Sequence, residues 1–248
     1  MTVRASLIIA WLLSGCGIAS ADDDLLVAVA SNFLPVAKTL AEDFEASTGV
    51  AVRLSPASSG KLYAQIVNGA PFHVFLSADE ARPRELVERE LAIANSRLTY
   101  AVGRLVLWSG DSQLQGSDCL SALRQQRGRV AVANPDTAPY GRAAMQFLNA
   151  VNIDVSDRRV TGENISQTLQ FAVRGGAQFG LLARVQAEVL PTQGCRYDVP
   201  AHQHAPIRQQ AVLLSRAANH PHAAAFLAYL TSQARDRIAA VGYEFDDD

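Results

Sequence analysis

The sequence is poor in lysine, and its charges nearly balance. Only Lys38 and Lys61 occur among 248 residues, and the formal net charge is −2. Proteins that bind nucleic acid carry a basic patch or stripe, often interleaved with aromatic residues, and the sequence has no such feature. A ligand site built from lysine side chains is disfavoured for the same reason. We therefore expect no nucleic-acid partner.

Motifs of hydrolytic enzymes are absent or incomplete. The sequence contains no G-x-S-x-G and no H-E-x-x-H. Ser58 and Lys61 fit the S-x-x-K of penicillin-recognising enzymes, but no S-D-N or K-T-G follows. The same segment lacks the first glycine and the final Ser/Thr of a Walker loop. We predict that the chain is not an enzyme; an exported serine hydrolase using Ser58 and Lys61 stays open as the remote alternative.

The first residues have the pattern of an export signal. Residues 1–4 are short and positively charged, and residues 5–13 are apolar but too short to span a bilayer. Two exits compete: a cleavage site at residues 19–21, and a lipoprotein box at residues 13–16 in which Cys16 would carry the lipid. We predict a signal segment at residues 1–21 and a periplasmic protein, either free or anchored at Cys16.

Cysteine is also scarce, and export to an oxidising compartment bears on whether the two cysteines outside the signal segment form a disulfide. Apart from Cys16, the chain has only Cys119 and Cys195, with no C-x-x-C spacing that would suggest zinc. In an oxidising compartment an even pair favours a disulfide. Two free buried thiols are the alternative.

Two predicted strands end in small hydroxyl residues at the start of a helix. Residues 25–30, LLVAVA, stop at Ser31-Asn32, and residues 50–55, VAVRLS, are followed by Ala57-Ser58-Ser59-Gly60. Ser and Asn can cap a helix, and the first-turn N–H groups have no partner within it. Each end alone is an ordinary cap, but two neighbouring ends form an anion site made of dipoles and hydroxyls. The pair predicts a binder of a small oxyanion.

Strand and helix patterns alternate along the rest of the chain, which predicts an α/β fold with mostly parallel sheets and helices on both faces. Two long apolar runs, at residues 98–108 and 207–215, indicate that the chain crosses to a second lobe and returns. We assign residues 24–103 and 208–248 to lobe 1 and residues 104–207 to lobe 2, with a ligand cleft between them. Residues 137–141 are interpreted as a turn and residues 161–166 as a loop, each leading into a helix. The acidic end, residues 244–248, is interpreted as a solvated tail.

Several segments together resemble the periplasmic molybdate-binding proteins of ABC importers. The similarity covers essentially all of residues 25–245 and is carried by these pieces: Val29-Ala30-Ser31-Asn32, Ala57-Ser58-Ser59-Gly60-Lys61-Leu62, Asn68-Gly69-Ala70-Pro71, Leu76-Ser77-Ala78-Asp79, Ala133-Asn134-Pro135, Pro139-Tyr140-Gly141, Gly162-Glu163-Asn164-Ile165 and Gly242-Tyr243. The resemblance implies the two-lobed type II binding-protein fold and a buried tetrahedral oxyanion, molybdate or tungstate. It also implies a membrane permease as partner, no cofactor, and a monomer.

The resemblance also implies which residues hold the anion through its oxygens. The family positions correspond to the hydroxyl and amide of Ser31, the amide of Asn32, the hydroxyl and amide of Ser59, and the amides of Tyr140 and Ile165. Some members add a tyrosine hydroxyl from the strand that here ends in Ala183, which has none. We infer that the Tyr140 hydroxyl, at a position where other members carry alanine, compensates from across the cleft.

The physical chemistry suits such a ligand. Molybdate is a dianion at neutral pH and needs only donors, each worth roughly 1.5–3 kcal/mol. Five to seven donors could leave a net binding free energy of about −8 to −12 kcal/mol after ordering and lobe closure. Selection against sulfate would rest on cavity size. A receptor for sulfate, phosphate or another small anion is the nearer alternative function.

Overall fold

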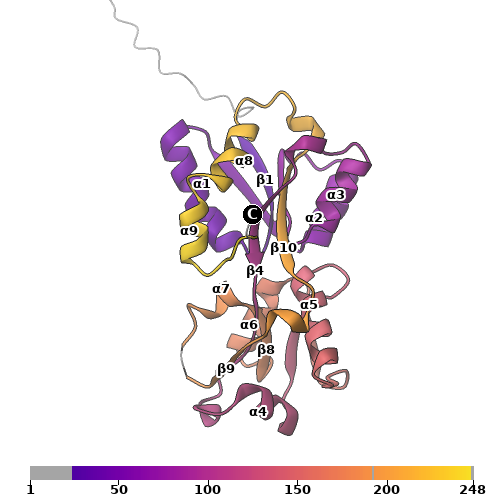
Figure 1. Ribbon diagram of the computed structural model, residues 1–248, viewed down its shortest axis with the longest axis vertical. Helices are drawn as coiled ribbons and strands as arrows, with labels where there is room; N and C mark the ends of the chain where they lie inside the picture. Colours follow the sequence, from indigo (N-terminus) through magenta and orange to yellow (C-terminus); the bar gives the residue numbers. More distant parts are fainter. Residues whose placement is uncertain (1–23, 192, 247–248) are drawn as a thin grey trace, which may run out of the picture.

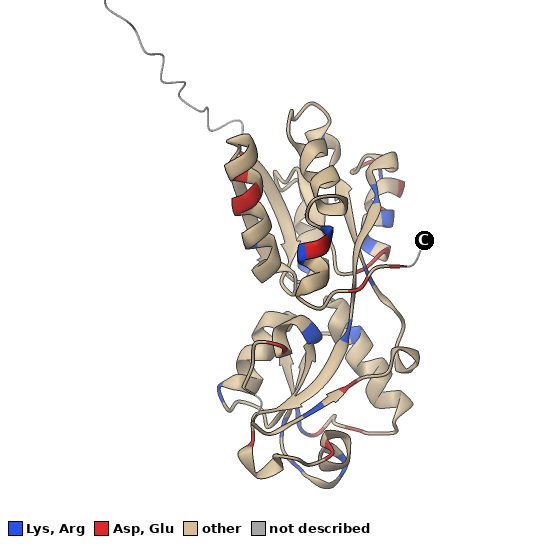
Figure 2. Cartoon of the chain, turned by 60° about the vertical axis from the view of Figure 1, so that its left-hand side comes forward, with Lys and Arg blue, Asp and Glu red and all other residues tan. Residues whose placement is uncertain are grey.

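The computed structural model describes residues 24–191 and 193–246. These form two α/β lobes, drawn one above the other in Figure 1, each built around a five-stranded sheet. The predicted signal segment and Cys16 lie outside the described residues. Within the described part of the chain, no helix has the length and hydropathy needed to cross a membrane. Acidic and basic residues are interspersed over both lobes (Figure 2).

The first lobe contains the sheet with strand order β2-β1-β3-β10-β4. Its strands are β1 (Leu25–Ala30), β2 (Val52–Ala57), β3 (Val74–Leu76), β4 (Leu98–Gly103) and β10 (Ile207–Leu213). One face is covered by α1 (Leu34–Thr48), α8 (Ala223–Thr231) and α9 (Arg235–Ala240), and the other by α2 (Ser59–Val67) and α3 (Ala81–Glu88). Strand β1 is apolar throughout because its alternate side chains serve both cores: Val27 and Val29 pack toward α1, and Ala28 toward α2.

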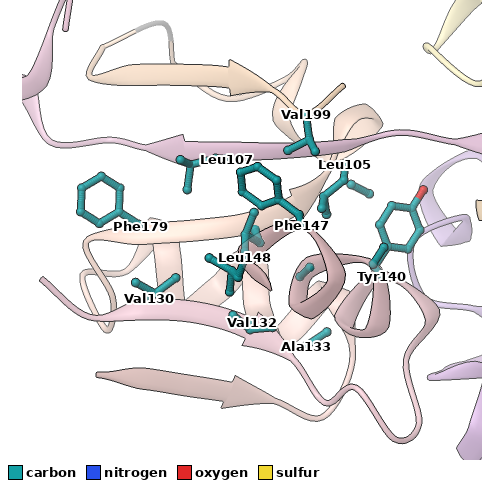
Figure 3. Packing of buried hydrophobic residues seen from close by; sticks show 14 of the residues in the cluster. Leu105, Leu107, Val130, Val132, Ala133, Tyr140, Phe147, Leu148, Phe179 and Val199 are labelled. Atoms are coloured by element: carbon teal, nitrogen blue, oxygen red, sulfur yellow. The ribbon is translucent and has the colours of Figure 1, made fainter. Parts of the chain in front are cut away.

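The second lobe contains the sheet with strand order β7-β6-β8-β5-β9. Its strands are β5 (Leu105–Ser109), β6 (Val130–Ala133), β7 (Arg159–Gly162), β8 (Phe179–Ala183) and β9 (Cys195–Asp198). Helices α4 (Cys119–Gln125) and α5 (Pro139–Ala150) cover one face, and α6 (Ile165–Val173) and α7 (Arg184–Ala187) the other. Figure 3 shows Phe147 and Leu148 of α5 packed against Leu107 and Val132 of the sheet.

Short 3-10 turns complete the connections, at Ala94–Ser96, Ser112–Leu114, Ala201–Gln203 and Ser215–Ala217. The chain passes between the lobes at Arg104, since β4 ends at Gly103 in one sheet and β5 begins at Leu105 in the other. It returns after β9 and re-enters the first sheet as β10. The apolar run at residues 98–108 is therefore two strands in different sheets.

The two-lobed α/β fold is confirmed, but the sheets are mixed where mostly parallel ones were predicted. Strands β1, β2 and β3 pair in parallel, and so do β6, β7 and β8. Strand β10 is antiparallel to β3 and β4, and β5 is antiparallel to β8 and β9. The strands that carry the chain between lobes enter each sheet against the direction of its βαβ units, which alternation of pattern does not reveal.

Three local predictions differ from the structure. Residues 139–141, expected as a turn, form the first turn of α5, since proline is well suited to the first helical position. The loop expected at residues 161–166 contributes to the edge strand β7. The described part of the acidic end, residues 244–246, is not a solvated tail: Glu244 pairs with Val102 through two backbone hydrogen bonds of 2.6 and 3.0 Å. Its carboxylate forms an ion pair with Arg104.

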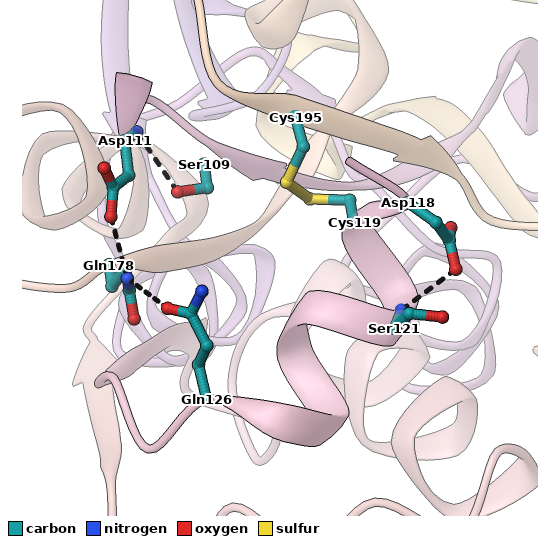
Figure 4. The surroundings of a disulfide bond; sticks show 8 residues. All are labelled: Ser109, Asp111, Asp118, Cys119, Ser121, Gln126, Gln178 and Cys195. Atoms are coloured by element: carbon teal, nitrogen blue, oxygen red, sulfur yellow. Dashed lines mark hydrogen bonds between the residues drawn. A yellow bond between two sulfur atoms is a disulfide. The ribbon is translucent and has the colours of Figure 1, made fainter. Parts of the chain in front are cut away.

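Cys119 and Cys195 are joined in a disulfide that ties α4 to the edge strand β9, as Figure 4 shows, with 5.1 Å between the Cα atoms. The bond closes a loop of 76 residues.

Because a cross-link restricts the unfolded chain, we expect reduction of the Cys119–Cys195 disulfide to lower the free energy of unfolding by about 2–4 kcal/mol, measured by urea denaturation with and without reductant. Mass spectrometry of the non-reduced, alkylated protein tests the bond itself: two alkylated thiols at these positions would contradict it.

Candidate functional site

The two hydroxyl-tipped strand ends predicted from the sequence lie side by side. Strands β1 and β2 pair in register, with Ala30 opposite Ala57, so Ser31 and Ser58 follow at the same edge of the sheet. The backbone N–H of Ser31 donates to the Ala57 carbonyl at 3.0 Å and holds the two ends together. This N–H, which the resemblance implied as an anion donor, is therefore already paired, and Ser31 offers the cavity only its hydroxyl. The edge formed by these carboxyl ends faces the second lobe.

A small cavity lies at this edge, with walls from both lobes. All five residues implied by the family resemblance line it: Ser31, Asn32, Ser59, Tyr140 and Ile165. Each is at most 4% exposed. Of the described residues that line the cavity, none carries a formal charge. Tyr140 and Ile165 come from the starts of α5 and α6, on the far side of the cleft from the serines.

The groups that face this cavity are unpaired hydrogen-bond donors. Among residues 24–191 and 193–246, no protein acceptor is found for the backbone N–H groups of Asn32, Ser59, Tyr140 and Ile165. The buried Ser31 hydroxyl likewise has no partner in this part of the chain. Buried polar groups are rarely left unpaired, so a cluster of them indicates a missing acceptor. The N-termini of α2, α5 and α6 add partial positive charge at the same place.

The two adjacent serines of α2 have different tasks. Ser58 is the N-cap, and its hydroxyl accepts from the Lys61 N–H at 3.4 Å. The Ser59 hydroxyl instead accepts from the N–H of Ala78 at 2.9 Å. Because that bond occupies the oxygen as an acceptor, the hydroxyl proton of Ser59 remains available for donation into the cavity. The sequence did not single out Ala78, since its contribution is a backbone N–H.

The cap predicted at the start of α1 is wrong in its details. Neither Ser31 nor Asn32 caps the helix, which begins at Leu34 after an uncapped Phe33. The Asn32 side chain is used elsewhere: its Nδ2 donates to Gln209 Oε1 at 2.8 Å and to the Tyr243 hydroxyl at 3.0 Å. Only the backbone N–H of Asn32 is therefore available to the cavity. At α6, by contrast, Asn164 caps the Ser166 and Gln167 amides and leaves the Ile165 N–H unpaired.

The Tyr140 side chain closes the second-lobe side of the site. Its ring belongs to the core of that lobe, and Figure 3 shows its hydroxyl pointing out of the cluster, away from Phe147. Burial raises the pKa of this phenol well above its usual value, so it is protonated at neutral pH. The hydroxyl lies against Gly103 of β4, where an added Cβ would collide with it. Ala183, at the end of β8, is fully buried and offers no polar group.

Direct hydrogen bonds between the lobes surround the cavity. The Gly60 N–H donates to the Thr137 carbonyl at 2.8 Å, and the Ser166 hydroxyl donates to the Ser31 carbonyl at 3.0 Å. Arg82 donates through Nη2 to the Asp136 carbonyl at 3.1 Å. These contacts join the two lobes directly around the site, so we expect a solute to enter it when the lobes move apart.

The geometry of Ser58 and Lys61 excludes the hydrolase alternative. The Ser58 hydroxyl is engaged as a helix cap. The Lys61 ammonium lies 2.8 Å from the Glu163 carboxylate, on the surface, and bridges the two lobes. A nucleophile needs its base within hydrogen-bonding reach, and Lys61 offers Ser58 only its backbone N–H. No group of three or more metal-ligating side chains occurs in the described ranges either.

A larger cavity of about 790 Å³ opens beside the small one. It shares Asn32 and Ser166 with the site region and runs between α1 and α9 of the first lobe and α6 and α7 of the second. Its walls are mainly apolar, with Val189 83% exposed and Val241 41% exposed. Of the five residues that supply the donors described above, Asn32 alone lines it, whereas all five line the small cavity, so we place the candidate site there.

Comparison with known proteins gives consistent matches. Residues 25–244 match the family described as bacterial extracellular solute-binding protein. The chain is 38% identical to the molybdate-binding protein ModA of Rhodobacter capsulatus over 98% of its length and 96% of that relative. It is 39% identical to ModA of Azotobacter vinelandii, covering 89% of each chain. The solved periplasmic molybdate-binding protein of A. vinelandii superposes with a TM-score of 0.84 at 36% identity, over 90% of this chain and all of that one.

Proposed function

The chain belongs to the bacterial extracellular solute-binding protein family, and on that premise we propose that it captures molybdate and delivers it to the permease of an ABC importer. Members of this family bind a solute for transport and are not enzymes. The observation that carries the proposal is the convergence of unpaired N–H and O–H donors from both lobes on one small cavity whose described lining residues include no charged side chain.

The donor set suits a fully ionised oxyanion. We propose that the anion is held by the hydroxyls of Ser31 and Ser59 and by the backbone N–H groups of Asn32, Ser59, Tyr140 and Ile165. The Tyr140 hydroxyl, which we expected to compensate for Ala183, lies against Gly103 and is not included among these donors. Six charge-assisted hydrogen bonds of roughly 1.5–3 kcal/mol each outweigh the free energy of lobe closure. Phosphate carries a proton at neutral pH and requires an acceptor, and no carboxylate lines the cavity among the described residues. Sulfate needs no acceptor and is rejected by size alone.

Tungstate and the export route extend the proposal. Tungstate has the same tetrahedral shape and charge as molybdate, so we expect the same donors to hold it. The segment at residues 1–21 would direct the chain to the periplasm. The solved relative from A. vinelandii is likewise named as a periplasmic protein. Cleavage at residues 19–21 and lipidation of Cys16 both remain open, and intact mass of the exported protein distinguishes them.

A melting series with four anions tests the function. A ligand that binds only the native state stabilises it by about 2.7 kcal/mol at a hundred times its dissociation constant. For a chain of this size we expect molybdate and tungstate each to raise the melting temperature by about 5–10 °C. Sulfate and phosphate at equal concentration should change it little. Equal stabilisation by sulfate would contradict selection by cavity size and favour the alternative of a general anion receptor.

A further inference from the structure

Gln209 occupies a central position in the strand that returns from the second lobe. It lies in β10 at a bulge between Gln209 and Gln210, and its side chain is completely buried. Its Oε1 atom accepts two hydrogen bonds, from Asn32 Nδ2 at 2.8 Å and from the Tyr100 hydroxyl at 3.2 Å. One half of the carboxamide therefore holds the side chain of Asn32, whose backbone N–H faces the candidate site.

The other half of the same carboxamide has no partner. Gln209 Nε2 and the Tyr140 hydroxyl are both buried and unpaired among the residues that the structure describes. Both atoms lie within 3.1 Å of one point, the position that a Cβ on Gly103 would occupy. The Gln209 amide donor of the first lobe and the Tyr140 hydroxyl of the second thus adjoin the same glycine, Gly103 of β4.

We propose that Gln209 is a positioning residue for anion binding that couples one donor of each lobe. In this structure the two atoms adjoin without a hydrogen bond between them. When the anion is bound and the lobes settle on it, Nε2 donates to the phenol oxygen of Tyr140 while Oε1 continues to hold Asn32. The start of α5, which presents the Tyr140 N–H, is thereby fixed relative to the Asn32 N–H. Gln209 itself does not touch the anion. The inference rests on the proposed function, since it concerns the geometry of the same anion site.

The chemistry of the position favours an amide over a carboxylate. The groups that surround Gln209 are the phenols of Tyr100, Tyr140 and Tyr243, whose pKa values are all raised by burial, so they stay neutral. Asp79 is the carboxylate that acts on this cluster, through Tyr100, and it is paired with Arg82. A carboxylate in place of the Gln209 carboxamide would have no N–H to donate to Tyr140, and its negative charge would repel the bound dianion. A protonated carboxylic acid would supply both a donor and an acceptor.

The test is the pH profile of molybdate affinity for Gln209→Glu, measured by calorimetry beside the unmodified chain. Burial raises the pKa of a carboxyl group, so at about pH 8 the variant holds a carboxylate and at about pH 5.5 mostly the acid. At the higher pH we expect Gln209→Glu to bind molybdate at least about thirtyfold more weakly than the unmodified chain. At the lower pH its affinity should recover to within about fivefold of that of the unmodified chain. Gln209→Met should bind about tenfold more weakly at both. Gln210→Glu is the control for a charge added to the same strand, because that side chain turns away from Gln209 to Arg97, Thr99 and Glu80.

A double-mutant cycle gives a second readout. Tyr140→Phe alone should weaken binding by about fivefold, and in the Gln209→Met background by less than about twofold, since the shared bond is already lost. The proposal is overturned if Gln209→Glu shows the same affinity ratio to the unmodified chain at both pH values, or if the two substitutions are additive. Failure of the proposed function would appear separately, as absence of molybdate binding by the unmodified chain.

Discussion

Replacement of Gly60 by valine should weaken molybdate binding by about a hundred- to ten-thousandfold while leaving the first lobe folded. A Cβ on Gly60 would lie 2.9 Å from both the Cα atom and the carbonyl oxygen of Thr137, and 2.9 Å from Arg82 Nη2. Backbone atoms of the opposite lobe can give way only if the lobes separate. Closure would then fail, and the two donors of the second lobe would be lost, at roughly 1.5–3 kcal/mol each.

Two controls separate this effect from misfolding. Gln65→Val places the same side chain on an exposed position of the same helix and should bind molybdate normally. The melting temperature of Gly60→Val without ligand should stay near that of the unmodified chain, and small-angle scattering should report a more open particle. Normal affinity in Gly60→Val would mean that the lobes need not meet at this point.

The first-lobe half of the site could be predicted from local sequence because it lies at consecutive strand ends. A buried strand followed by Ser31-Asn32, and a partly exposed edge strand followed by Ser58-Ser59, form a local pattern. Parallel pairing of neighbouring strands then brings the ends together. The pattern did not reveal which serine caps and which points into the cavity, because that depends on the Ala78 N–H, which comes from another segment.

The second-lobe half was inferred from family resemblance and not from local pattern. The relevant groups of Tyr140 and Ile165 are backbone N–H groups, which every residue except proline possesses, so no side chain marks them. Their availability depends on helix starts: Pro139 opens α5, and the Asn164 side chain caps the two amides that follow Ile165. Only the tertiary arrangement of the lobes places these helix starts opposite the serines.

Gln209 and the chain end show how nonlocal contacts escape prediction. A glutamine within an apolar strand suggests a solvent-facing position, yet Gln209 is fully buried because Asn32 and Tyr100 satisfy its oxygen. Residues 244–246 suggest a solvated tail, yet the backbone of Glu244 pairs with β4 and Asp246 lies 2.9 Å from Arg208. The partners of Gln209 and Glu244 lie more than a hundred residues away along the chain. For Glu244, opposite charge alone does not specify which arginine is the partner.

Two substitutions at Ser59 should weaken molybdate binding to different degrees, because one only removes the hydroxyl donor and the other also adds a negative charge. Ser59→Ala removes one charge-assisted hydrogen bond and should weaken molybdate binding by roughly 1.5–3 kcal/mol, about ten- to a hundredfold. Ser59→Asp adds a carboxylate within reach of a dianion in a buried cavity, where unit charges about 4 Å apart interact by about 4 kcal/mol even at an effective dielectric constant of 20. Its binding should fall more than about a thousandfold.

The neighbouring serine supplies a matched control in which stability, and not affinity, responds. Ser58→Ala deletes the cap of α2 and should lower the free energy of unfolding by about 1 kcal/mol, with little change in molybdate affinity, because the Ser58 oxygen serves the Lys61 N–H. Ser59→Ala should instead lower affinity, with a smaller loss of stability from the unpaired Ala78 N–H. Calorimetric titration and urea denaturation of both variants check the pair. Unchanged affinity in Ser59→Ala would overturn the proposed site, because the Ser59 oxygen is held at the cavity by the Ala78 N–H and its proton is proposed to bind the anion.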